Sequence, residues 1–550
     1  MKQLKSSEIR KRSLLVLAAI LLFAATTASS QTYSDLYNLG SNSGDPTSPF
    51  YIGAFTQGQD GNLYSTSQNG GTFNHGAIFR LTPAGKVTVL HNFSGADGTV
   101  PHGGLTLGTD GSLYGTTSSG GTNNLGIVFK INTSGNFTVL HNFMDAGDGL
   151  NPLAGPTQGT DGNFYGTVGQ TFGPWSMYKI TPSGKLTTVF TATSSIENGH
   201  TPGTLVLGTD GNFYGATQFG GTEDRGTVFK ITPQGKYTML HSFIAADGQN
   251  ALSPLIQASD GNFYGIADQG GTKGIGTIYK LTPAKAFSVI YNFQSTVTGY
   301  EPHVGPVQAT DGKLYGTASS ITGGLFFQVS TTGVYKIVHN CDIPTGFVPQ
   351  VPMFQHTNGT LYGDTSAGGT GNVSPCVSGS CGVLYSLSMG LHPFISFVGP
   401  DFLGKVGNTI EILGQGFTGT TKVSLNGAAA TFKVVSNTYL TATVPSAATK
   451  GFVTVTTPGG MLTSNRKFLV LPTITSFAPI SGPVGTKVVI TGTGFTGTTK
   501  VTFGAKATSF IVNSNTQVTA NVPTGAVTGK ISITTAGGTA TSATVFTVTP

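Results

Sequence analysis

Residues 110–131 read DGSLYGTTSSGGTNNLGIVFKI, and this stretch decides the fold because the chain repeats it. Its opening pattern, Asp-Gly-x-(Leu/Phe)-Tyr, occurs six times, and a seventh copy has Asn in place of Asp. The copies begin at Asp60, Asp110, Asp161, Asp210, Asp260, Asp311 and Asn358. Their spacings are 50, 51, 49, 50, 51 and 47 residues. A regular period of this length is typical of a β-propeller, in which each blade is one repeated small sheet.

Each copy has the pattern of a four-stranded antiparallel sheet. In the second copy we expect strands over residues 105–109, 113–117, 127–131 and 137–143. Asp110-Gly111 fits a tight hairpin turn, because positive φ costs Gly little and Asp tolerates it. Seven such units predict a seven-bladed β-propeller over residues 31–390, with six or eight blades as the alternatives if one repeat is mis-phased.

The two ends of the array predict that the ring closes on itself. Residues 33–39 resemble the last strand of the first copy, 88–93, although they precede all seven copies. The seventh copy ends with its third strand, 383–387, and no fourth strand follows. We therefore expect the N-terminal segment to complete the last blade.

A different period, of 78 residues, begins near residue 393. Gly-Phe-Thr-Gly-Thr-Thr-Lys-Val occurs at 416–423 and again at 494–501. Short alternating strands at this length predict two immunoglobulin-like β-sandwiches, over 393–471 and 472–550. The predicted fold class is therefore all-β: a seven-bladed β-propeller followed by two immunoglobulin-like β-sandwiches. Neither sandwich contains Cys or Trp, so the core of antibody-type domains is excluded.

Both periods resemble known families. The Leu-Tyr-Gly-Thr-Thr-x-x-Gly-Gly-Thr core and the Gly-x-Val-Phe-Lys-Ile strand resemble the GloVer repeat of exported bacterial proteins, which implies export and a propeller-like array. The later pair resembles IPT/TIG domains through Ile-Thr-Ser-Phe-x-Pro, Gly-x-Gly-Phe and a late Val-Pro; the first copy is one residue short at 397–400. Such domains occur in surface receptors, in carbohydrate-acting extracellular enzymes and in some transcription factors, so they do not assign a function.

The composition excludes several classes of protein. Charged residues make up only 9% of the chain, which argues against coiled coils and helical solenoids. Hydrophobic residues at 38% and aromatic residues at 10% can support a core, which argues against disorder. The abundance of Gly, 81 residues, fits many short strands joined by tight turns.

Residues 1–30 have the features of a signal peptide. Five basic residues precede an apolar run over 13–25, and small residues precede Gln31, where cleavage would fit. An uncleaved anchor is the alternative. Without this segment the chain has 23 basic and 21 acidic residues, a net charge of +2, and no basic cluster for nucleic acid. No second apolar segment is long enough to span a membrane. We therefore expect a secreted or cell-surface protein with no transmembrane segment in the mature chain.

The chain has three cysteines, and export would favour their oxidation. Cys376 and Cys381 could close a small loop as a disulfide, which leaves Cys341 alone. Cys341 could instead pair with either of them. A metal site is disfavoured, because no His or second Cys pair lies at a suitable spacing.

The candidate ligand residues lie in the loops that precede the first strand of each unit. They are Asp97, His102, Asp148, Asp247 and His303. His102 and His303 each stand eight residues before a hairpin Asp, so they occupy equivalent positions in two blades. These loops would share one face near the central opening, although an ordinary polar loop role is favoured. The six hairpin Asp residues fit turn formation better than calcium binding or acid–base chemistry. The His residues that recur at 91, 141, 241 and 339 fit packing better than a metal array, because they lie in different blades.

No catalytic motif is present, so we expect no catalytic residue, metal or cofactor. The leading hypothesis is an exported, non-enzymatic binding or cell-surface interaction protein whose propeller loop face recognises a glycan or a protein. The alternative is an extracellular polysaccharide-acting hydrolase or lyase with the IPT/TIG pair as accessory modules. A glycosidase would need two carboxylates about 5–10 Å apart, and the sequence places no such pair. A structural surface protein without a soluble ligand is the third possibility.

Overall fold

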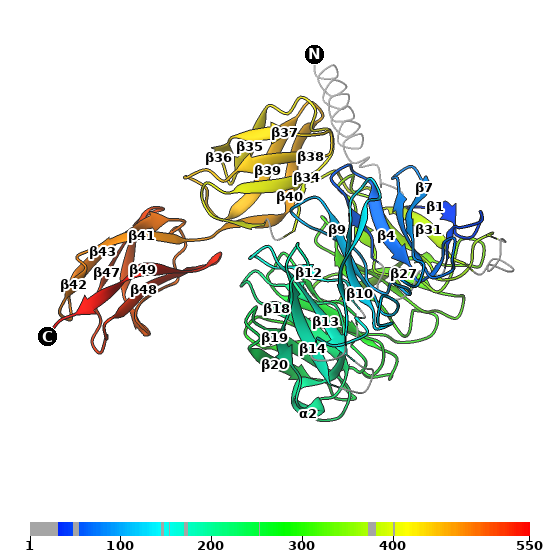
Figure 1. The fold of residues 1–550 in the computed structure, drawn as a ribbon, viewed down its shortest axis with the longest axis horizontal. Coiled ribbons are helices and arrows are strands. Elements are labelled where there is room, and N and C mark those ends of the chain that lie inside the picture. The colour runs from blue at the N-terminus through cyan, green and yellow to red at the C-terminus, as the bar shows by residue number, and fades with distance from the viewer. Residues whose placement is uncertain are drawn as a thin grey trace, which may run out of the picture.

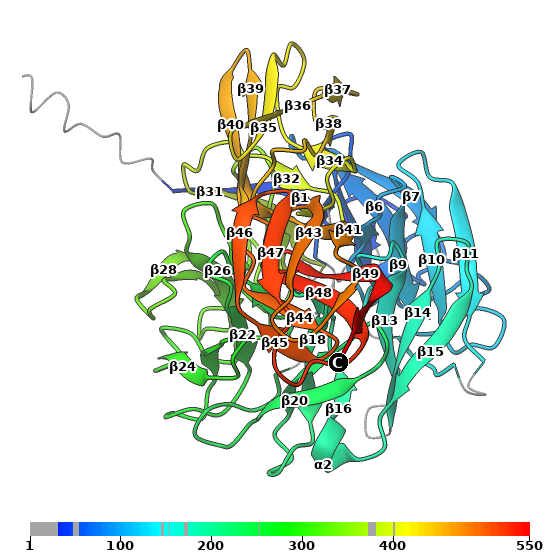
Figure 2. The same cartoon turned by 90° about the vertical axis from the view of Figure 1, so that its left-hand side faces the viewer.

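The computed structural model describes residues 31–47, 54–144, 148–152, 154–169, 174–251, 253–371, 381–399 and 402–550. The predicted signal peptide, 1–30, lies outside them. The described residues form small sheets around a common channel, and two β-sandwiches follow this ring (Figures 1 and 2). The all-β fold class is confirmed. Within the described residues, no helix is both long and apolar enough to cross a membrane.

Each of the seven sequence copies forms one sheet, which we number as units 1 to 7 along the chain. The innermost strands are two-residue pairs: β3 (Thr56–Gln57), β8 (Thr106–Leu107), β12 (Thr157–Gln158), β17 (Val206–Leu207), β21 (Ile256–Gln257), β25 (Val307–Gln308) and β29 (Phe354–Gln355). The second strands are β4 (Leu63–Ser67), β9 (Leu113–Thr117), β13 (Phe164–Gly169), β18 (Phe213–Phe219), β22 (Phe263–Ala267), β26 (Leu314–Ala318) and β30 (Leu361–Asp364).

The outer half of each unit has two longer strands. The third strands are β6 (Ala77–Leu81), β10 (Ile127–Ile131), β14 (Trp175–Ile180), β19 (Thr227–Ile231), β23 (Thr277–Leu281), β27 (Leu325–Val329) and β31 (Val383–Ser388). The fourth strands are β7 (Val87–Asn92), β11 (Phe137–Asn142), β15 (Leu186–Thr191), β20 (Tyr237–Ser242), β24 (Phe287–Asn292), β28 (Tyr335–Asn340) and, for unit 7, β1 (Thr32–Asn38). The second and third strands are almost wholly buried, whereas the fourth strands are half-buried at the outer rim.

The ring closes through the N-terminal strand, as the sequence predicts. Strand β1 pairs antiparallel with β31, so Tyr33 lies opposite Leu387 and Asn38 opposite Val383. The first residues of the repeat region thereby become the outer strand of the last unit. Unit 7 also contacts unit 1 directly, because Gln57 Oε1 accepts a hydrogen bond of 3.0 Å from the Thr357 amide.

The repeated Asp-Gly-x-(Leu/Phe)-Tyr pattern is a hairpin clamp. In unit 1, Asp60 Oδ1 accepts a hydrogen bond from the Asn62 amide, and Asp60 Oδ2 accepts one from the Tyr64 hydroxyl at 2.8 Å. The same tyrosine-to-aspartate bond of 2.7–2.9 Å occurs in units 2 to 6. In unit 7 the amide of Asn358 instead donates to the Tyr362 hydroxyl. The hairpin acids therefore fix the turn and anchor a buried ring, which is the structural role expected from their sequence context.

Repeated polar side-chain contacts join each unit to the next. Gln158, Gln257, Gln308 and Gln355 each accept a hydrogen bond from a turn amide of the preceding unit. Further along the second strands, a threonine hydroxyl donates a hydrogen bond to a backbone carbonyl of the following unit. The donors are Thr66, Thr116, Thr167 and Thr317. Buried polar side chains are thus satisfied between neighbours, which fixes the register of one unit on the next.

Two sandwiches follow the ring. The first has one sheet of β32 (Ser396–Phe397), β34 (Thr409–Leu413), β38 (Tyr439–Thr443) and β37 (Phe432–Val434), and a second of β33 (Leu403–Gly404), β40 (Gly460–Val470), β39 (Gly451–Thr457), β35 (Lys422–Leu425) and β36 (Ala428–Ala430). The second sandwich repeats this order with β41 (Thr473–Ala478), β43 (Lys487–Thr493), β47 (Gln517–Asn521) and β46 (Phe510–Ser514), packed on β42 (Ser481–Gly482), β49 (Gly538–Val548), β48 (Gly529–Thr535), β44 (Lys500–Phe503) and β45 (Lys506–Thr508).

Candidate functional site

The ring has two faces. The hairpin turns at the Asp-Gly pairs lie on one, which we call the turn face, and the loops that enter the first strand of each unit lie on the other, the loop face. The five predicted ligand residues lie in the described part of the loop face. Asp97 Oδ1 accepts a hydrogen bond of 2.8 Å from the Ser94 amide, and its Oδ2 lies 3.0 Å from His91 Nε2.

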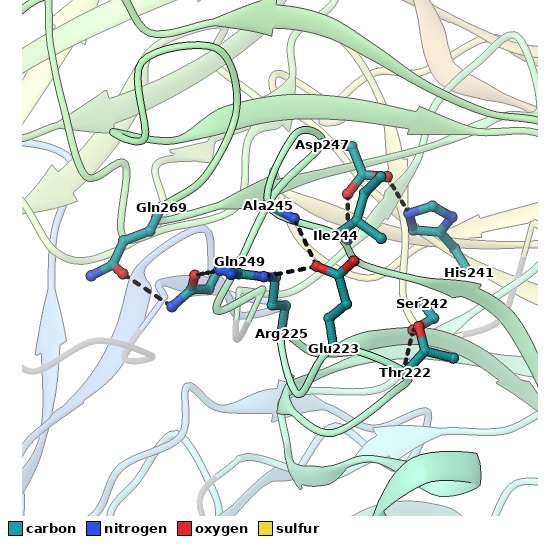
Figure 3. A network of polar contacts seen from close by, with 10 residues as sticks. All are labelled: Thr222, Glu223, Arg225, His241, Ser242, Ile244, Ala245, Asp247, Gln249 and Gln269. Atoms are coloured by element: carbon teal, nitrogen blue, oxygen red, sulfur yellow. Dashed lines mark hydrogen bonds and ion pairs between the residues drawn. The ribbon is translucent and has the colours of Figure 1, made fainter.

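Asp148 and Asp247 repeat this arrangement in other units. Asp148 Oδ2 is hydrogen-bonded to His141 Nε2 at 2.7 Å, and Asp247 Oδ2 to His241 Nε2 at 3.0 Å. Asp247 Oδ1 also accepts a hydrogen bond from the Ile244 amide, as Figure 3 shows. Each of these acids therefore holds its own loop against the fourth strand of its own unit.

The strand-four histidines are also packing groups. His91 stacks on Phe137 of the next unit with ring centroids 3.8 Å apart, and His241 stacks on Phe287 at 3.6 Å. Burial lowers the pKa of His91, and Asp97 partly opposes that effect. The stacking joins one unit to the next at the outer rim, which is the structural role that the sequence favours for these histidines.

The other two candidate residues are histidines, and they are half-buried like the three acids. His303 Nδ1 lies 3.1 Å from Asp268 Oδ2, and this partner holds the pKa of His303 above its usual value although burial acts to lower it. Burial lowers the pKa of His102. Four of the five candidates therefore have a side-chain partner within the ring: Asp97, Asp148, Asp247 and His303. None of these contacts joins one candidate to another. Ligand binding by these five residues stays a prediction.

The channel on the loop-face side is apolar. A cavity of about 230 Å³ is lined by residues of all seven units, including Phe55, Leu105, Ile256, Val307 and Met353. Among the described residues no group of three His, Cys, Asp or Glu side chains could hold a metal ion. Cys341 is a free, buried thiol and Cys381 is disulfide-bonded; Cys376 lies outside the described residues.

The first sandwich docks on the turn face. Thr438 Oγ1 donates a hydrogen bond of 2.8 Å to the Gln59 carbonyl, and Gln415 Nε2 donates one of 2.8 Å to Thr357 Oγ1. Val398, Leu413 and Tyr439 are buried and join one hydrophobic cluster with Leu107 and other residues of units 1 and 2. The first sandwich therefore covers part of the channel opening on the turn face.

Among the described residues, three cavities lie between the ring and the first sandwich. The first, of about 340 Å³, lies over the innermost strands, and its lining includes Gln57, Leu207, Leu413 and Arg466. The largest, which we call the main cleft, has a volume of about 750 Å³ and lies between units 5 to 7 and the sandwich. The third, the side cleft, has about 370 Å³, and its lining includes Asp260, Lys450, Arg466 and Lys467.

Arg466 borders all three cavities. Its Nη2 donates a hydrogen bond of 3.2 Å to the Gln257 carbonyl, and its guanidinium lies 5.4 Å from the centre of the Phe402 ring. Burial lowers the pKa of Arg466, yet a guanidinium stays charged at any physiological pH. Nowhere in the described part of the chain does a carboxylate form an ion pair with it.

Two large apolar side chains are exposed at the main cleft. Phe452 is 42% exposed and Met461 67% exposed, and both line the cleft. Lys467 Nζ lies 5.6 Å from the centre of the Phe452 ring. The cleft thus combines an exposed aromatic face, a cationic edge and neutral polar walls, which is the mixture common in ligand sites at domain boundaries.

Two sequence families cover most of the chain. Residues 21–174 and 168–376 match the Gloeobacter/Verrucomicrobia repeat, which is more than half of the protein. The chain belongs to the Gloeobacter/Verrucomicrobia repeat family. Residues 393–469 and 472–548 match the IPT/TIG domain. Both resemblances seen in the sequence are thereby confirmed. No curated protein matches this member of the repeat family in sequence.

Solved structures resemble this repeat protein only distantly. TolB from Acinetobacter baumannii is 11% identical with a TM-score of 0.33, and the match covers 48% of this chain and 61% of TolB. SGBP-B from a xyloglucan utilization locus in Bacteroides uniformis is 19% identical with a TM-score of 0.15, covering 28% of this chain and 48% of that one. A fungal AA5-family alcohol oxidase is 13% identical with a TM-score of 0.42, covering 80% and 99%. The chain therefore spans only about half to three-fifths of the first two, and scores this low do not bear on the function of the repeat protein.

The cleft was missed from the sequence, although one signal for it exists. The two sandwiches align residue by residue from the late Val-Pro onward, so the second is an internal reference for the first. Arg466 and Lys467 correspond to Thr544 and Val545 in the second sandwich. Phe452 corresponds to Lys530, and Lys450 to Thr528. The immunoglobulin-like fold therefore does not require the cationic and aromatic side chains at these positions, which marks them as specific to the docked domain.

Proposed function

We propose that the protein is an exported, non-enzymatic binding protein that holds a glycan or protein ligand in the main cleft. The observation that carries the proposal is the cleft itself. Its volume of about 750 Å³ lies in the range of small-ligand sites, about 300–1,000 Å³. The exposed Phe452 and Met461 offer an apolar surface, and Ser259, Thr310 and Thr463 offer hydroxyl groups along the walls. Export rests on the sequence features of residues 1–30.

The placement of the acidic residues supports binding rather than hydrolysis. In the described lining of the main cleft the single acid is Asp311, which accepts the Tyr315 hydroxyl and lies 3.3 Å from Lys313 Nζ. The side cleft likewise has Asp260, which accepts the Tyr264 hydroxyl. Both belong to hairpin clamps that recur around the ring. Glycoside hydrolysis usually needs two carboxylates facing one bond, and neither lining offers such a pair.

A glycan array probed with the purified protein tests this proposal. The variants Phe452→Ala and Met461→Ala should each weaken binding of an array ligand about tenfold, because they remove exposed contact area without disturbing a core. Ile511→Ala, an exposed apolar residue of the second sandwich, is the matched control and should leave binding unchanged. Unaltered binding by both cleft variants would place the site elsewhere. Loss of binding in Asp97→Asn or Asp247→Asn would indicate that the ligand binds on the loop face instead.

The same ligands allow the enzymatic alternative to be measured. We expect no new reducing ends when the protein is incubated with a ligand that it binds. Sustained release of shortened products, abolished by Asp311→Asn or Asp260→Asn, would overturn the non-enzymatic proposal.

A further inference from the structure

We infer that the ligand is an anionic saccharide, whose carboxylate or sulfate groups are held by Arg466 together with Lys450 and Lys467. This inference rests on the proposed function, since it names the class of glycan that the cleft would take. It is carried by the arrangement of cations around the main cleft and the side cleft, which share Gln257, Ser259 and Arg466 in their linings.

Arg466 is the central group. It borders the main cleft, the side cleft and the cavity over the channel, so an anion entering from either cleft can reach it. One of its donors reaches the Gln257 carbonyl, and Phe402 supports one face of the guanidinium. A guanidinium has five N–H donors in a planar fork that matches carboxylate and sulfate oxygens. No ion pair within the described chain uses those remaining donors.

The lysines extend this positive region along the side cleft. Lys450 and Lys467 line it together with Arg466, whereas Asp260 is the only acid among its described lining residues. Asp260 accepts hydrogen bonds from Asn262 and Tyr264 in its own hairpin. Although partial burial acts to raise it, hydrogen bonds from Asn262 and Tyr264 hold the pKa of Asp260 below its usual value. Lys280 also lies 3.9 Å from Asp260. Among the described lining residues, Asp260 is thus the single negative charge that faces the three cations, and Lys280 offsets it.

The walls favour a saccharide over an acidic peptide. The lining of the main cleft includes the hydroxyl groups of Ser259, Thr310 and Thr463, which can exchange hydrogen bonds with the hydroxyl groups of a sugar. The exposed face of Phe452 can pack against the C–H face of a sugar ring, next to the ammonium group of Lys467. Hairpin turns and the linker near residue 392 form the opposite wall.

Calorimetric titration of the full protein with a hexamer of galacturonic acid tests the inference, with the methyl-esterified hexamer as its uncharged counterpart. A sulfated galactan hexamer separates carboxylate from sulfate recognition. In low salt the acid form should bind at least about tenfold tighter than the ester, and the advantage should shrink as salt rises. Equal affinities would overturn the inference and leave the proposed function standing. No binding of any array glycan would overturn both.

Four variants assign the effect to the cleft. Arg466→Gln should lower affinity for the preferred acidic hexamer about tenfold, Arg466→Lys less, and Lys467→Val about threefold. Lys422→Thr removes an exposed lysine of the same sandwich that lines none of the clefts, and it should have no effect. Retained binding of the neutral ester shows that Arg466→Gln has left the cleft intact. Equal losses for ester and acid, or tighter binding of a poly-glutamate peptide than of any hexamer, would contradict the assignment.

Discussion

At the scale of single residues, Asp364 departs from the pattern of its position. Four other units have Thr there, and each Thr hydroxyl donates to a carbonyl of the following unit. Asp364 is fully buried, and neither of its carboxylate oxygens has a hydrogen-bond partner in the described chain. Burial raises the pKa of Asp364 well above its usual range. The folded protein therefore favours the protonated form of this carboxyl group.

We expect Asp364→Thr to raise the free energy of unfolding by about 2 kcal/mol at pH 7, because a buried unpaired carboxyl group is costly. The folded-state pKa exceeds the unfolded value of about 3.9, so the wild type binds the extra proton when folded and loses stability as the pH rises above about 4. The gain from Asp364→Thr should therefore shrink toward pH 4. Urea unfolding at pH 4 and pH 7 measures this difference. Thr116→Asp should behave in the opposite way, and an equal gain at both pH values would refute the argument.

At the scale of the element, the hairpin clamp explains why the repeat has this signature. The aspartate binds a turn amide with one oxygen and the tyrosine hydroxyl with the other, so one side chain fixes both the turn and the buried ring. In unit 3, hydrogen bonds from Asn163 and Tyr165 outweigh partial burial and lower the pKa of Asp161. In this unit the clamp therefore uses an ionised acceptor, and hydrogen bonds to charged groups are the stronger kind.

Removing one tyrosine hydroxyl measures how much the hairpin clamp contributes to the free energy of unfolding. Tyr165→Phe should lower the free energy of unfolding by about 1.5–3 kcal/mol, because the Asp161 carboxylate loses a donor. Tyr362→Phe should cost only about 1 kcal/mol, because its partner is the neutral Asn358 at 3.0 Å. Chemical unfolding of the two variants gives the comparison, and a larger loss for Tyr362→Phe would show that ring packing rather than the charged bond decides stability.

The elements were largely predictable, and the exceptions have physical causes. Strands over 113–117 and 127–131 agree with the expected ranges, because short, mostly buried segments between glycine turns fix both ends. The innermost strand is shorter than expected: only Thr106–Leu107 pairs, since the residues before it line the channel. The fourth strands are half-buried, because no further strand covers the outer edge of each unit.

At the scale of the whole molecule, the docked sandwich was the part that the sequence could not place. Turns that look like ordinary solvent-exposed hairpins in one repeat form the surface that contacts Thr438 and Gln415. A period indicates which strands form, but not which turns another domain covers. The sequence indicates candidate ligand residues on the loop face by their polar side chains. In the structure, the acids among them accept hydrogen bonds from backbone amides of their own loops.

Docking can be tested with residues taken from the equivalent positions of the second sandwich. The double variant Leu413→Thr and Tyr439→Gln introduces the residues found at the equivalent positions, Thr491 and Gln517. We expect the first sandwich to stay folded but to separate from the ring, because two buried apolar contacts are lost. Small-angle scattering should then show a larger radius of gyration. An unchanged radius would mean that the polar contacts alone hold the domain.

Closure of the ring is testable with a new cross-link. Ser34 and Ser386 lie opposite each other in the β1–β31 pair. The variant Ser34→Cys with Ser386→Cys should form a disulfide and raise the free energy of unfolding by about 2–4 kcal/mol when oxidised. The same variant under reducing conditions is the control. Failure to form the bond in the folded protein would show that β1 is not the outer strand of unit 7.

The pairing of β1 with β31 also determines when the ring can close during synthesis. Synthesis proceeds from the N-terminus, so β1 is complete long before its partner at Val383–Ser388 exists. At about 5–20 residues per second, that wait is about 20–70 s. During this time units 1 to 6 form one after another, and β1 has no partner until unit 7 is made. At high concentration we expect two chains to exchange their first strands at that stage, which makes a strand-swapped dimer the assembly error to look for.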